Sequence, residues 1–412
     1  MALASTLKEM IIMQLQINLT IPSQPLYASS CKNGKKSLEI QADNNKITVS
    51  VLYDYSDTPL TLCGEIKEND TVKINLLDHI IELYINGILI DEDWCMGERY
   101  FDFSDTVSTK NEITVTEYEN TENEQPCVLY SFENAEGWRP GNGVFVGDCM
   151  PYRKNDEYHV LYLKDRRHHR SKWGMGAHQW EHISTKDFKI WYVHPMAVPI
   201  TESWEGSICT GSHIEKDGRE YLYYTVRRSN GLPAIISRSI SEDGYHFKKD
   251  KSFGFTLSDK YNGAVARDPK VFKDENGLYH MILTTVLVKE NLGCLAHCIS
   301  TDLENWQEVE HPIYTVENSD HPECPDYFKF KFKYYLVFSI RGRARYLVSN
   351  SPFDSFERID DTLIPCAGVP KCAIWDGKLI FTGFKPIDGY AGTMTFKAAT
   401  ADENGRLIFE DL

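Results

Sequence analysis

A short pattern that returns along residues 140–412 limits the folds open to this chain. In its clearest copies an apolar run ends in Ser or Thr, an Asp follows within three positions, and an aromatic residue comes next. The copies lie at 183–191, 240–247 and 299–306, with weaker ones at 348–356 and 399–403. Copies about 50–60 residues apart indicate a repeat architecture, in which each unit is one supersecondary structure.

Hairpin signals separate the strand-like runs inside each unit. Asp217-Gly218, Asn276-Gly277 and Asp376-Gly377 lie between runs rich in aromatic and β-branched residues, and such dipeptides favour tight hairpin turns. A unit of this size holds about four short strands, the size of a propeller blade. The sequence therefore predicts an all-β chain with a five-bladed β-propeller over residues 133–412, in which loops from different blades meet at a central channel.

Residues 1–132 follow a different pattern. Apolar and polar residues alternate over 38–42 and 46–51, and 81–90 resembles a hairpin around Asn86-Gly87. This pattern predicts a small β-sandwich-like (lectin-like) domain before the propeller, with the acidic stretch 119–125 as the linker.

The composition excludes several functions. A net charge of −16 argues against nucleic acid and anionic membranes as partners. No apolar run reaches the roughly 18 residues of a membrane span, and residues 1–22 lack a leader pattern, so a cytoplasmic location is expected. The 11 cysteines are scattered without paired metal spacing, which predicts reduced, buried thiols.

Three short segments place a carboxylate before an aromatic, strand-like run. The acids are Asp148, Asp268 and Glu323, and superposing the repeat units places them at equivalent positions of three blades. Converging acids are costly unless a ligand or a reaction uses them. Glycoside hydrolysis needs two carboxyl groups that flank the scissile bond. The trio therefore predicts an active site for a small carbohydrate.

The neighbours of the acids suggest separate roles. Glu323 lies between a proline and a cysteine, a semi-apolar setting that suits an acid/base. Asp268 follows Arg267, which favours the ionised carboxylate. The acids of the repeat pattern itself are expected to cap turns: Asp187, Asp243 and Asp302.

These motifs resemble glycoside hydrolase family 32, the β-fructosidases related to invertase and levanase. Arg267-Asp268-Pro269 resembles the family's Arg-Asp-Pro motif, and Glu323-Cys324-Pro325-Asp326 resembles its Glu-Cys motif. Trp180-Glu181-His182 is similar to its Trp-Gly-His segment, and residues 206–212 are similar to its Ser-Gly-Ser blade start. The motifs keep their order over about 280 residues.

The resemblance implies a retaining, double-displacement glycosidase that acts on a fructoside or a related furanoside. In that mechanism Asp148 is the nucleophile, Glu323 the acid/base and Asp268 the transition-state stabiliser. The expected substrate contacts are Arg267, Ser207, Trp180 and Trp204. A tryptophan at a strand end can equally belong to a blade core.

The chain departs from the family pattern close to Asp148. Gly147 stands where the family has an Asn, and Leu163 stands where it has a Gln after the second strand. A β domain precedes the propeller, whereas in the family a sandwich follows it. Two further functions therefore stay open: an inverting glycosidase of the arabinanase or xylosidase type, and a non-catalytic carbohydrate-binding protein.

A basic segment, residues 164–173, stands out in this acidic chain. Lys164, Asp165 and His169 are its predicted substrate-binding residues, in a loop that borders the pocket and favours an anionic or hydroxyl-rich sugar. The alternative is a solvated loop that balances nearby acids. Its histidines show no metal-ligand spacing, so neither a metal nor a cofactor is predicted.

Overall fold

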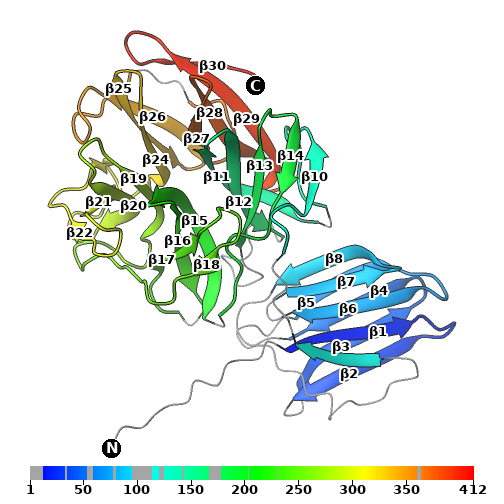
Figure 1. Cartoon of the computed structure of the whole chain (residues 1–412). Coiled ribbons are helices and arrows are strands. Elements are labelled where there is room, and N and C mark those ends of the chain that lie inside the picture. The colour runs from blue at the N-terminus through cyan, green and yellow to red at the C-terminus, as the bar shows by residue number, and fades with distance from the viewer. Residues whose placement is uncertain are drawn as a thin grey trace, which may run out of the picture. The chain divides into compact units, whose positions relative to one another are not determined.

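The computed structural model describes residues 13–32, 35–52, 59–77, 80–94, 114–119, 125–141, 143–166, 178–202, 204–229, 231–359 and 363–412. These residues form strands joined by turns and bends, with no helix among them, so the predicted all-β class is confirmed. The chain divides into two compact units after Gln125. Figure 1 shows both units.

The first unit consists of two antiparallel sheets. One has the order β8-β7-β6-β1-β9, with β1 (Met13–Thr20), β6 (Thr71–Leu77), β7 (Ile80–Ile85), β8 (Ile88–Trp94) and β9 (Thr114–Glu119). The other has the order β2-β3-β4-β5, with β2 (Leu26–Lys32), β3 (Lys35–Asp43), β4 (Lys46–Val51) and β5 (Leu60–Glu65).

Alternating side chains hold these two sheets together. Ile47, Val49 and Val51 of β4 are fully buried, while the residues between them are partly exposed. A Cβ atom on Gly64 of β5 would lie 2.8 Å from Ile85 of β7, so the sheets pack face to face. The predicted hairpin is present, because Asn86 and Gly87 join β7 to β8 with φ angles of 51° and 79°.

The second unit contains five successive groups of antiparallel strands, and the pairing of Val146 with Gly392 joins the first and fifth groups into one sheet. The first group is β11 (Phe145–Lys154), β12 (Glu157–Asp165), β13 (Gln179–Thr185) and β14 (Ile190–Val193), with β10 (Tyr130–Glu133) paired to β14. The second is β15 (Glu205–Lys216), β16 (Arg219–Arg228), β17 (Ile235–Ser241) and β18 (Lys248–Lys249). The third is β19 (Arg267–Lys273), β20 (Tyr279–Leu287), β21 (Leu292–Ser300), β22 (Gln307–Glu308) and β23 (Tyr314–Thr315). The fourth is β24 (Glu323–Phe330), β25 (Lys333–Ile340) and β26 (Arg343–Ser349), and the fifth is β27 (Lys371–Trp375), β28 (Lys378–Pro386), β29 (Gly392–Ala401) and β30 (Leu407–Glu410).

The first strands of the five groups lie beside one another. Contacts join β11 to β15, β15 to β19, β19 to β24, β24 to β27 and β27 back to β11. In Figure 1 β11, β15, β19 and β24 lie toward the middle of the second unit, with β10, β18 and β22 farther out. This order brings the starts of distant strands together. The five-bladed closure of the sheets stays a prediction.

The position of β10 bears on the expected domain boundary. The sequence suggested a division between residues 132 and 133, which lies inside β10. Because β10 pairs with β14 over Tyr130–Glu133, it belongs to the second unit. The compact units divide a few residues earlier, at the end of the predicted linker.

The repeat pattern itself forms turns, as predicted for Asp187, Asp243 and Asp302. Each Asp accepts two backbone N–H bonds at 2.8–2.9 Å from the residues two and three positions later. The preceding Ser or Thr hydroxyl also lies within hydrogen-bond distance of each carboxylate. These acids therefore serve the fold.

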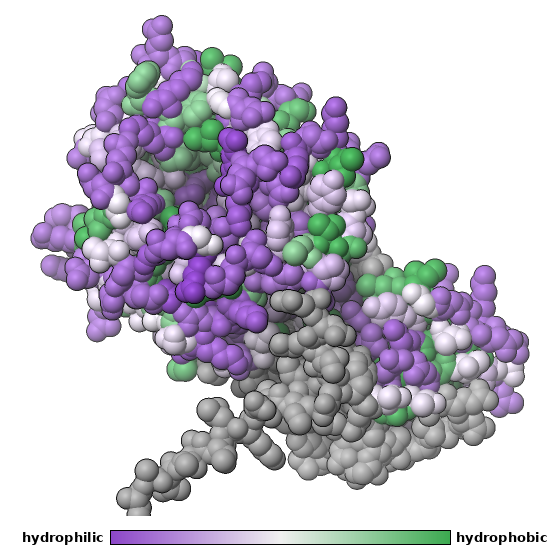
Figure 2. Space-filling model, viewed as in Figure 1, coloured by the Kyte–Doolittle hydropathy of each residue, from purple (hydrophilic) through white to green (hydrophobic). Residues whose placement is uncertain are grey.

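Surface and thiols agree with the composition. Figure 2 shows hydrophilic side chains over most of the visible face of the second unit. The ten cysteines within the described part of the chain form no disulfide bonds, and six of them are buried. Over the same residues, the structure contains no apolar helix of membrane-spanning length.

Candidate active site

The three acids lie at β-bulges near the starts of β11, β19 and β24. In each strand two residues lie opposite one on the partner strand, between the paired residues Val146 and Cys149, Arg267 and Lys270, and Glu323 and Asp326. A further bulge lies at the matching place in β15, over Ile208–Gly211. A bulge bends its strand and changes the direction of its side chains. The shared bulge explains why these segments look alike in the sequence.

The acids occupy successive positions within this bulge. Glu323 is the last paired residue before the bulge in β24, Asp268 is the first residue inside the bulge in β19, and Asp148 is the second in β11. The expectation of strictly equivalent positions is therefore wrong by one residue from each acid to the next. Because successive side chains of a strand point in different directions, the three carboxylates extend from their strands in different directions.

One cavity of about 290 Å³ nevertheless takes in all three acids. Its walls come from the starts of the first strands and from connections in the fourth and fifth groups. The lining residues are Asp148, Leu163, His178, Cys209, Thr210, Arg267, Asp268, Glu323, Cys324, Gly342, Gly368, Val369, Phe384, Pro386 and Tyr390. The predicted convergence of Asp148, Asp268 and Glu323 is therefore present in the structure.

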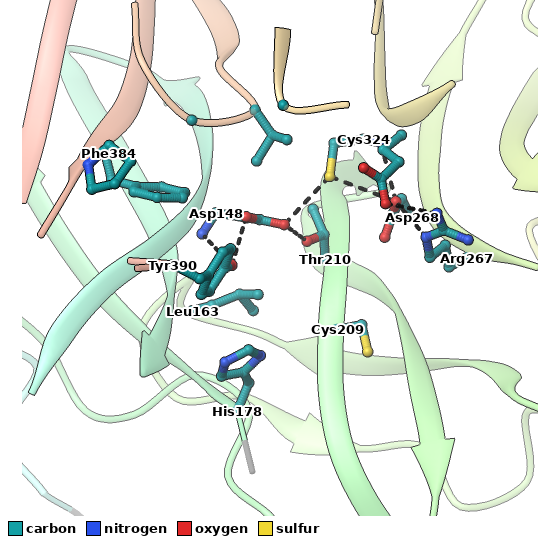
Figure 3. Close-up of a pocket in the computed structure, with 15 residues that line it drawn as sticks. Asp148, Leu163, His178, Cys209, Thr210, Arg267, Asp268, Cys324, Phe384 and Tyr390 are labelled. Carbon is teal, nitrogen blue, oxygen red and sulfur yellow. Dashed lines mark hydrogen bonds and ion pairs between the residues drawn. The ribbon is translucent and has the colours of Figure 1, made fainter. Parts of the chain in front are cut away.

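Both oxygens of the Asp148 carboxylate accept hydrogen bonds. The Tyr390 hydroxyl donates to Oδ1 at 2.6 Å, and the Thr210 hydroxyl donates to Oδ2. Thr210 occupies the same bulge position in β15 as Asp148 does in β11. Figure 3 shows the carboxylate between these two hydroxyls. Asp148 is thus fixed in its orientation.

Cys324 separates two of the acids. Its Sγ lies 3.3 Å from Asp148 Oδ2 and 3.5 Å from Asp268 Oδ2, and its backbone N–H donates to Asp268 Oδ2 at 3.0 Å. Burial, followed by the charges of Asp148 and Asp268, raises the pKa of the Cys324 thiol well above its usual value. The thiol therefore stays protonated and donates toward both carboxylates (Figure 3).

Arg267 lies between Asp268 and Glu323 and interacts with both. Its guanidinium lies 2.7 Å from Glu323 Oε1 and 3.5 Å from Asp268 Oδ2. Glu323 is therefore not in the semi-apolar setting expected from its sequence neighbours, since its side chain is 31% exposed and ion-paired. For Asp268, burial raises the pKa of the carboxyl and Arg267 opposes that rise. The sequence neighbour Arg267 is thus the weaker of the two influences on Asp268, and burial is the stronger.

Of the six predicted substrate contacts that lie within the described residues, Arg267 alone lines this cavity. Ser207 is buried, and its Oγ accepts the His178 backbone N–H at 3.1 Å. The carboxylate of Asp165, also buried, lies 2.6 Å from His178 Nε2. These two residues therefore support His178, which lines the pocket.

The remaining predicted contacts lie elsewhere or outside the described residues. Trp180 is fully buried and its Nε1 donates to Cys209 O at 3.0 Å, so it supports the pocket wall and presents no face for a sugar. Trp204 lies under the Arg228 guanidinium, 5.9 Å from the ring centre. Lys164 pairs with Glu181 at 3.0 Å. His169 lies outside the described residues, as does most of the basic segment.

Comparison with known proteins places the chain in a family. Residues 149–357 match the model of the glycosyl hydrolases family 32 N-terminal domain, which is just over half of the chain. The chain belongs to glycosyl hydrolase family 32. The predicted resemblance is confirmed.

Relatives within family 32 are distant. Sucrose-6-phosphate hydrolase from Escherichia coli is 23% identical over 294 residues, which cover 62% of this chain and 59% of that protein. Sucrose-6-phosphate hydrolase from Bacillus subtilis (strain 168) is 30% identical over 203 residues, with 46% and 41% covered. The structure of fructan 1-exohydrolase IIa from Cichorium intybus in complex with 1-kestose matches with a TM-score of 0.57 at 16% identity, covering 68% of this chain and 61% of that one. The chain thus spans about half the length of the curated relatives it matches.

The family 32 match begins at Cys149, one residue after Asp148. Asp268 and Glu323 lie inside the matched range, whereas Asp148 and Gly147 lie just outside it.

Several lining residues were missed by the sequence predictions. Thr210 lies in the segment similar to the Ser-Gly-Ser blade start, and His178 lies two residues before Trp180, so motif neighbourhood was their available signal. Tyr390 had no such signal, because it lies 242 residues from Asp148 in an ordinary turn sequence.

A cluster of buried histidines lies away from the pocket lining. His159, His182 and His194 have ring nitrogens close enough to hold a metal ion. His159 Nδ1 lies 3.0 Å from His182 Nε2, and the pair His280–His297 repeats this contact at 2.8 Å in the third group. Among the described residues no third histidine joins His280 and His297 in such a group, so we interpret both pairs as cross-strand hydrogen bonds of the repeat.

Proposed function

We propose that this family 32 chain is a glycosidase that cleaves a fructoside or a related furanoside with retention of configuration, on a five-bladed β-propeller. The observation that carries the proposal is the single cavity lined by Asp148, Asp268 and Glu323, in which Cys324 and Arg267 hold the carboxylates apart and in place. Buried acids brought together in one pocket are typical of catalytic sites, which favours an enzyme over a carbohydrate-binding protein.

The division of labour follows from the contacts. Asp148, with both oxygens fixed, attacks the anomeric carbon and forms the glycosyl-enzyme bond. Glu323, the most exposed acid of the trio, protonates the leaving oxygen and then takes a proton from the attacking water. Asp268, buried beside Arg267, accepts hydrogen bonds from sugar hydroxyls and stabilises the positive charge of the transition state.

The substrate class comes from the relatives. Those reported above are named sucrose-6-phosphate hydrolases, and the matched solved structure is a fructan exohydrolase bound to 1-kestose. A cavity of about 290 Å³ suits one sugar ring with part of a second. We therefore propose a terminal fructosyl unit as the group that enters the pocket.

The test is hydrolysis of sucrose, sucrose 6-phosphate and 1-kestose, with the first-formed anomer of the released sugar identified by NMR. Retention supports the proposal, and inversion supports the arabinanase-type alternative. Asp148→Asn is expected to lower kcat on the order of 10⁴-fold, whereas the matched turn-cap variant Asp187→Asn keeps activity. Sugar binding by calorimetry without turnover would show a carbohydrate-binding protein.

A further inference from the structure

Tyr390 lies 242 residues after the proposed nucleophile in the sequence but beside it in the fold, where Val146 of β11 pairs with Gly392 of β29. It lies in the turn between β28 and β29, and its hydroxyl makes two bonds with one residue. It donates to Asp148 Oδ1 at 2.6 Å and accepts the Asp148 backbone N–H at 3.2 Å. Side chain and backbone of Asp148 are therefore held by a single phenol (Figure 3).

The turn that carries Tyr390 is conformationally costly. Asp388, Gly389 and Ala391 have φ angles of 53°, 144° and 65°, a region that non-glycine residues seldom adopt. The Ile387 N–H donates to Ala391 O at 3.0 Å and closes the turn. Strain of this kind persists where the surrounding structure imposes it, and it clusters at functional sites. The strained turn directs Tyr390 into the pocket.

The space around the phenol is shaped to admit it. A Cβ atom on residue 147 would lie 2.8 Å from the Tyr390 hydroxyl oxygen and 3.0 Å from Leu163 Cβ. Phe384 packs edge-on against the Tyr390 ring at 5.1 Å between centroids. Gly147 therefore leaves the room that the hydroxyl occupies.

We propose that Tyr390 is a positioning residue for the nucleophile, which fixes the Asp148 carboxylate together with Thr210. This inference rests on the proposed function. Tyr390 transfers no proton. Its hydrogen bond stops the carboxylate from rotating away from the anomeric carbon, and it stabilises the carboxylate as it leaves when the glycosyl-enzyme bond breaks. Burial, followed by the Asp148 charge, raises the pKa of Tyr390 well above its usual value, so the hydroxyl stays a donor.

The experiment compares Tyr390→Phe with a matched control, Tyr335→Phe. Tyr335 is a fully buried tyrosine whose hydroxyl likewise donates one hydrogen bond, at 2.9 Å to Gly405 O, but it belongs to the core shared by the fourth and fifth groups, away from the acids. Tyr390→Phe is expected to lower kcat/KM on the order of 10²-fold through misplacement of the nucleophile. The acidic limb of its pH profile should also move to higher pH, because the carboxylate form loses a donor. Tyr335→Phe should change neither quantity.

The outcomes separate this inference from the proposed function. If the wild type cleaves fructosides and Tyr390→Phe behaves like Tyr335→Phe, the inference is overturned while the proposed function stands. If the wild type cleaves none of the sugars, the proposed function fails, and crystal structures of the wild type and Tyr390→Phe decide the inference. A rotated Asp148 carboxylate in the variant supports it, and an unmoved carboxylate overturns it.

Discussion

At the scale of single residues, the site solves the problem of holding several carboxylates in one cavity. The Cys324 thiol lies between Asp148 and Asp268, and Arg267 lies between Asp268 and Glu323. A hydrogen-bond donor or a cation thus lies between each acid and its nearest neighbour among the three. The ionised form of Asp268 is still disfavoured, because burial raises the pKa of its carboxyl despite the neighbouring arginine.

Replacing Asp268 by Asn should lower the activity of the enzyme without lowering its stability. A raised folded-state pKa means that the charged form is disfavoured in the fold, so the wild type loses stability as pH rises through this pKa. Asn removes that charge and keeps an acceptor for the Cys324 N–H. We expect kcat to fall on the order of 10²–10³-fold, with no loss in the free energy of unfolding at pH 7 by urea denaturation. Retained activity, or clear destabilisation, would contradict this account.

At the scale of elements, the bulges decide which side chains enter the cavity. The same bulge occurs in β11, β15, β19 and β24, and it supplies an acid or its hydrogen-bond partner in each case. Gly211 follows the bulge in β15, where a Cβ atom would lie 1.8 Å from Tyr223 O. The strand partner therefore lies too close for any side chain at residue 211.

The variant Gly211→Ala tests whether residue 211 must lack a side chain, and Gly263→Ala is the control. Residue 263 has no neighbouring atom within 4 Å of a Cβ and no unusual φ angle. We expect Gly211→Ala to lower the free energy of unfolding by about 1–3 kcal/mol through overpacking, and to lower kcat because Thr210 is displaced from Asp148. Gly263→Ala should leave both quantities close to those of the wild type. Equal behaviour of the two variants in urea unfolding and kinetics would argue against a tight bulge.

The sequence predicted what is local and repeated, and it missed what depends on distant contacts. Hairpins such as Asn86-Gly87 and the Asp187 turn follow from residue chemistry within a few positions. The one-residue offsets between Asp148, Asp268 and Glu323 depend on where the bulge falls relative to each acid, and no local preference sets that position. The Asp148–Tyr390 contact spans 242 residues and exists only when the first and last groups meet.

At the scale of the whole molecule, the second unit buries histidines that are neutral in the fold. Burial lowers the pKa of His159 to about 3 and that of His297 to about 4, with neighbouring histidines adding to the effect. Burial also lowers the pKa of four further histidines: His182, His194, His213 and His280. In the unfolded chain these side chains have the ordinary value of 6.5. Below that pH the unfolded chain therefore binds more protons than the folded one.

The free energy of unfolding should consequently fall as pH drops from about 6.5 toward 4, by up to about 1.4 kcal/mol per pH unit for each such histidine. Asp268 acts in the opposite direction, but it is one group against these six histidines and His321, whose pKa burial also lowers. Replacing His280 and His297 together by Phe and Leu should make this dependence less steep, because the pair is removed without leaving an unpaired ring nitrogen. The exposed His311→Gln is the control and should leave the slope unchanged. Urea unfolding across this pH range provides the measurement, and a wild-type stability that stays flat would show that the buried histidines do not set the acid limit of the fold.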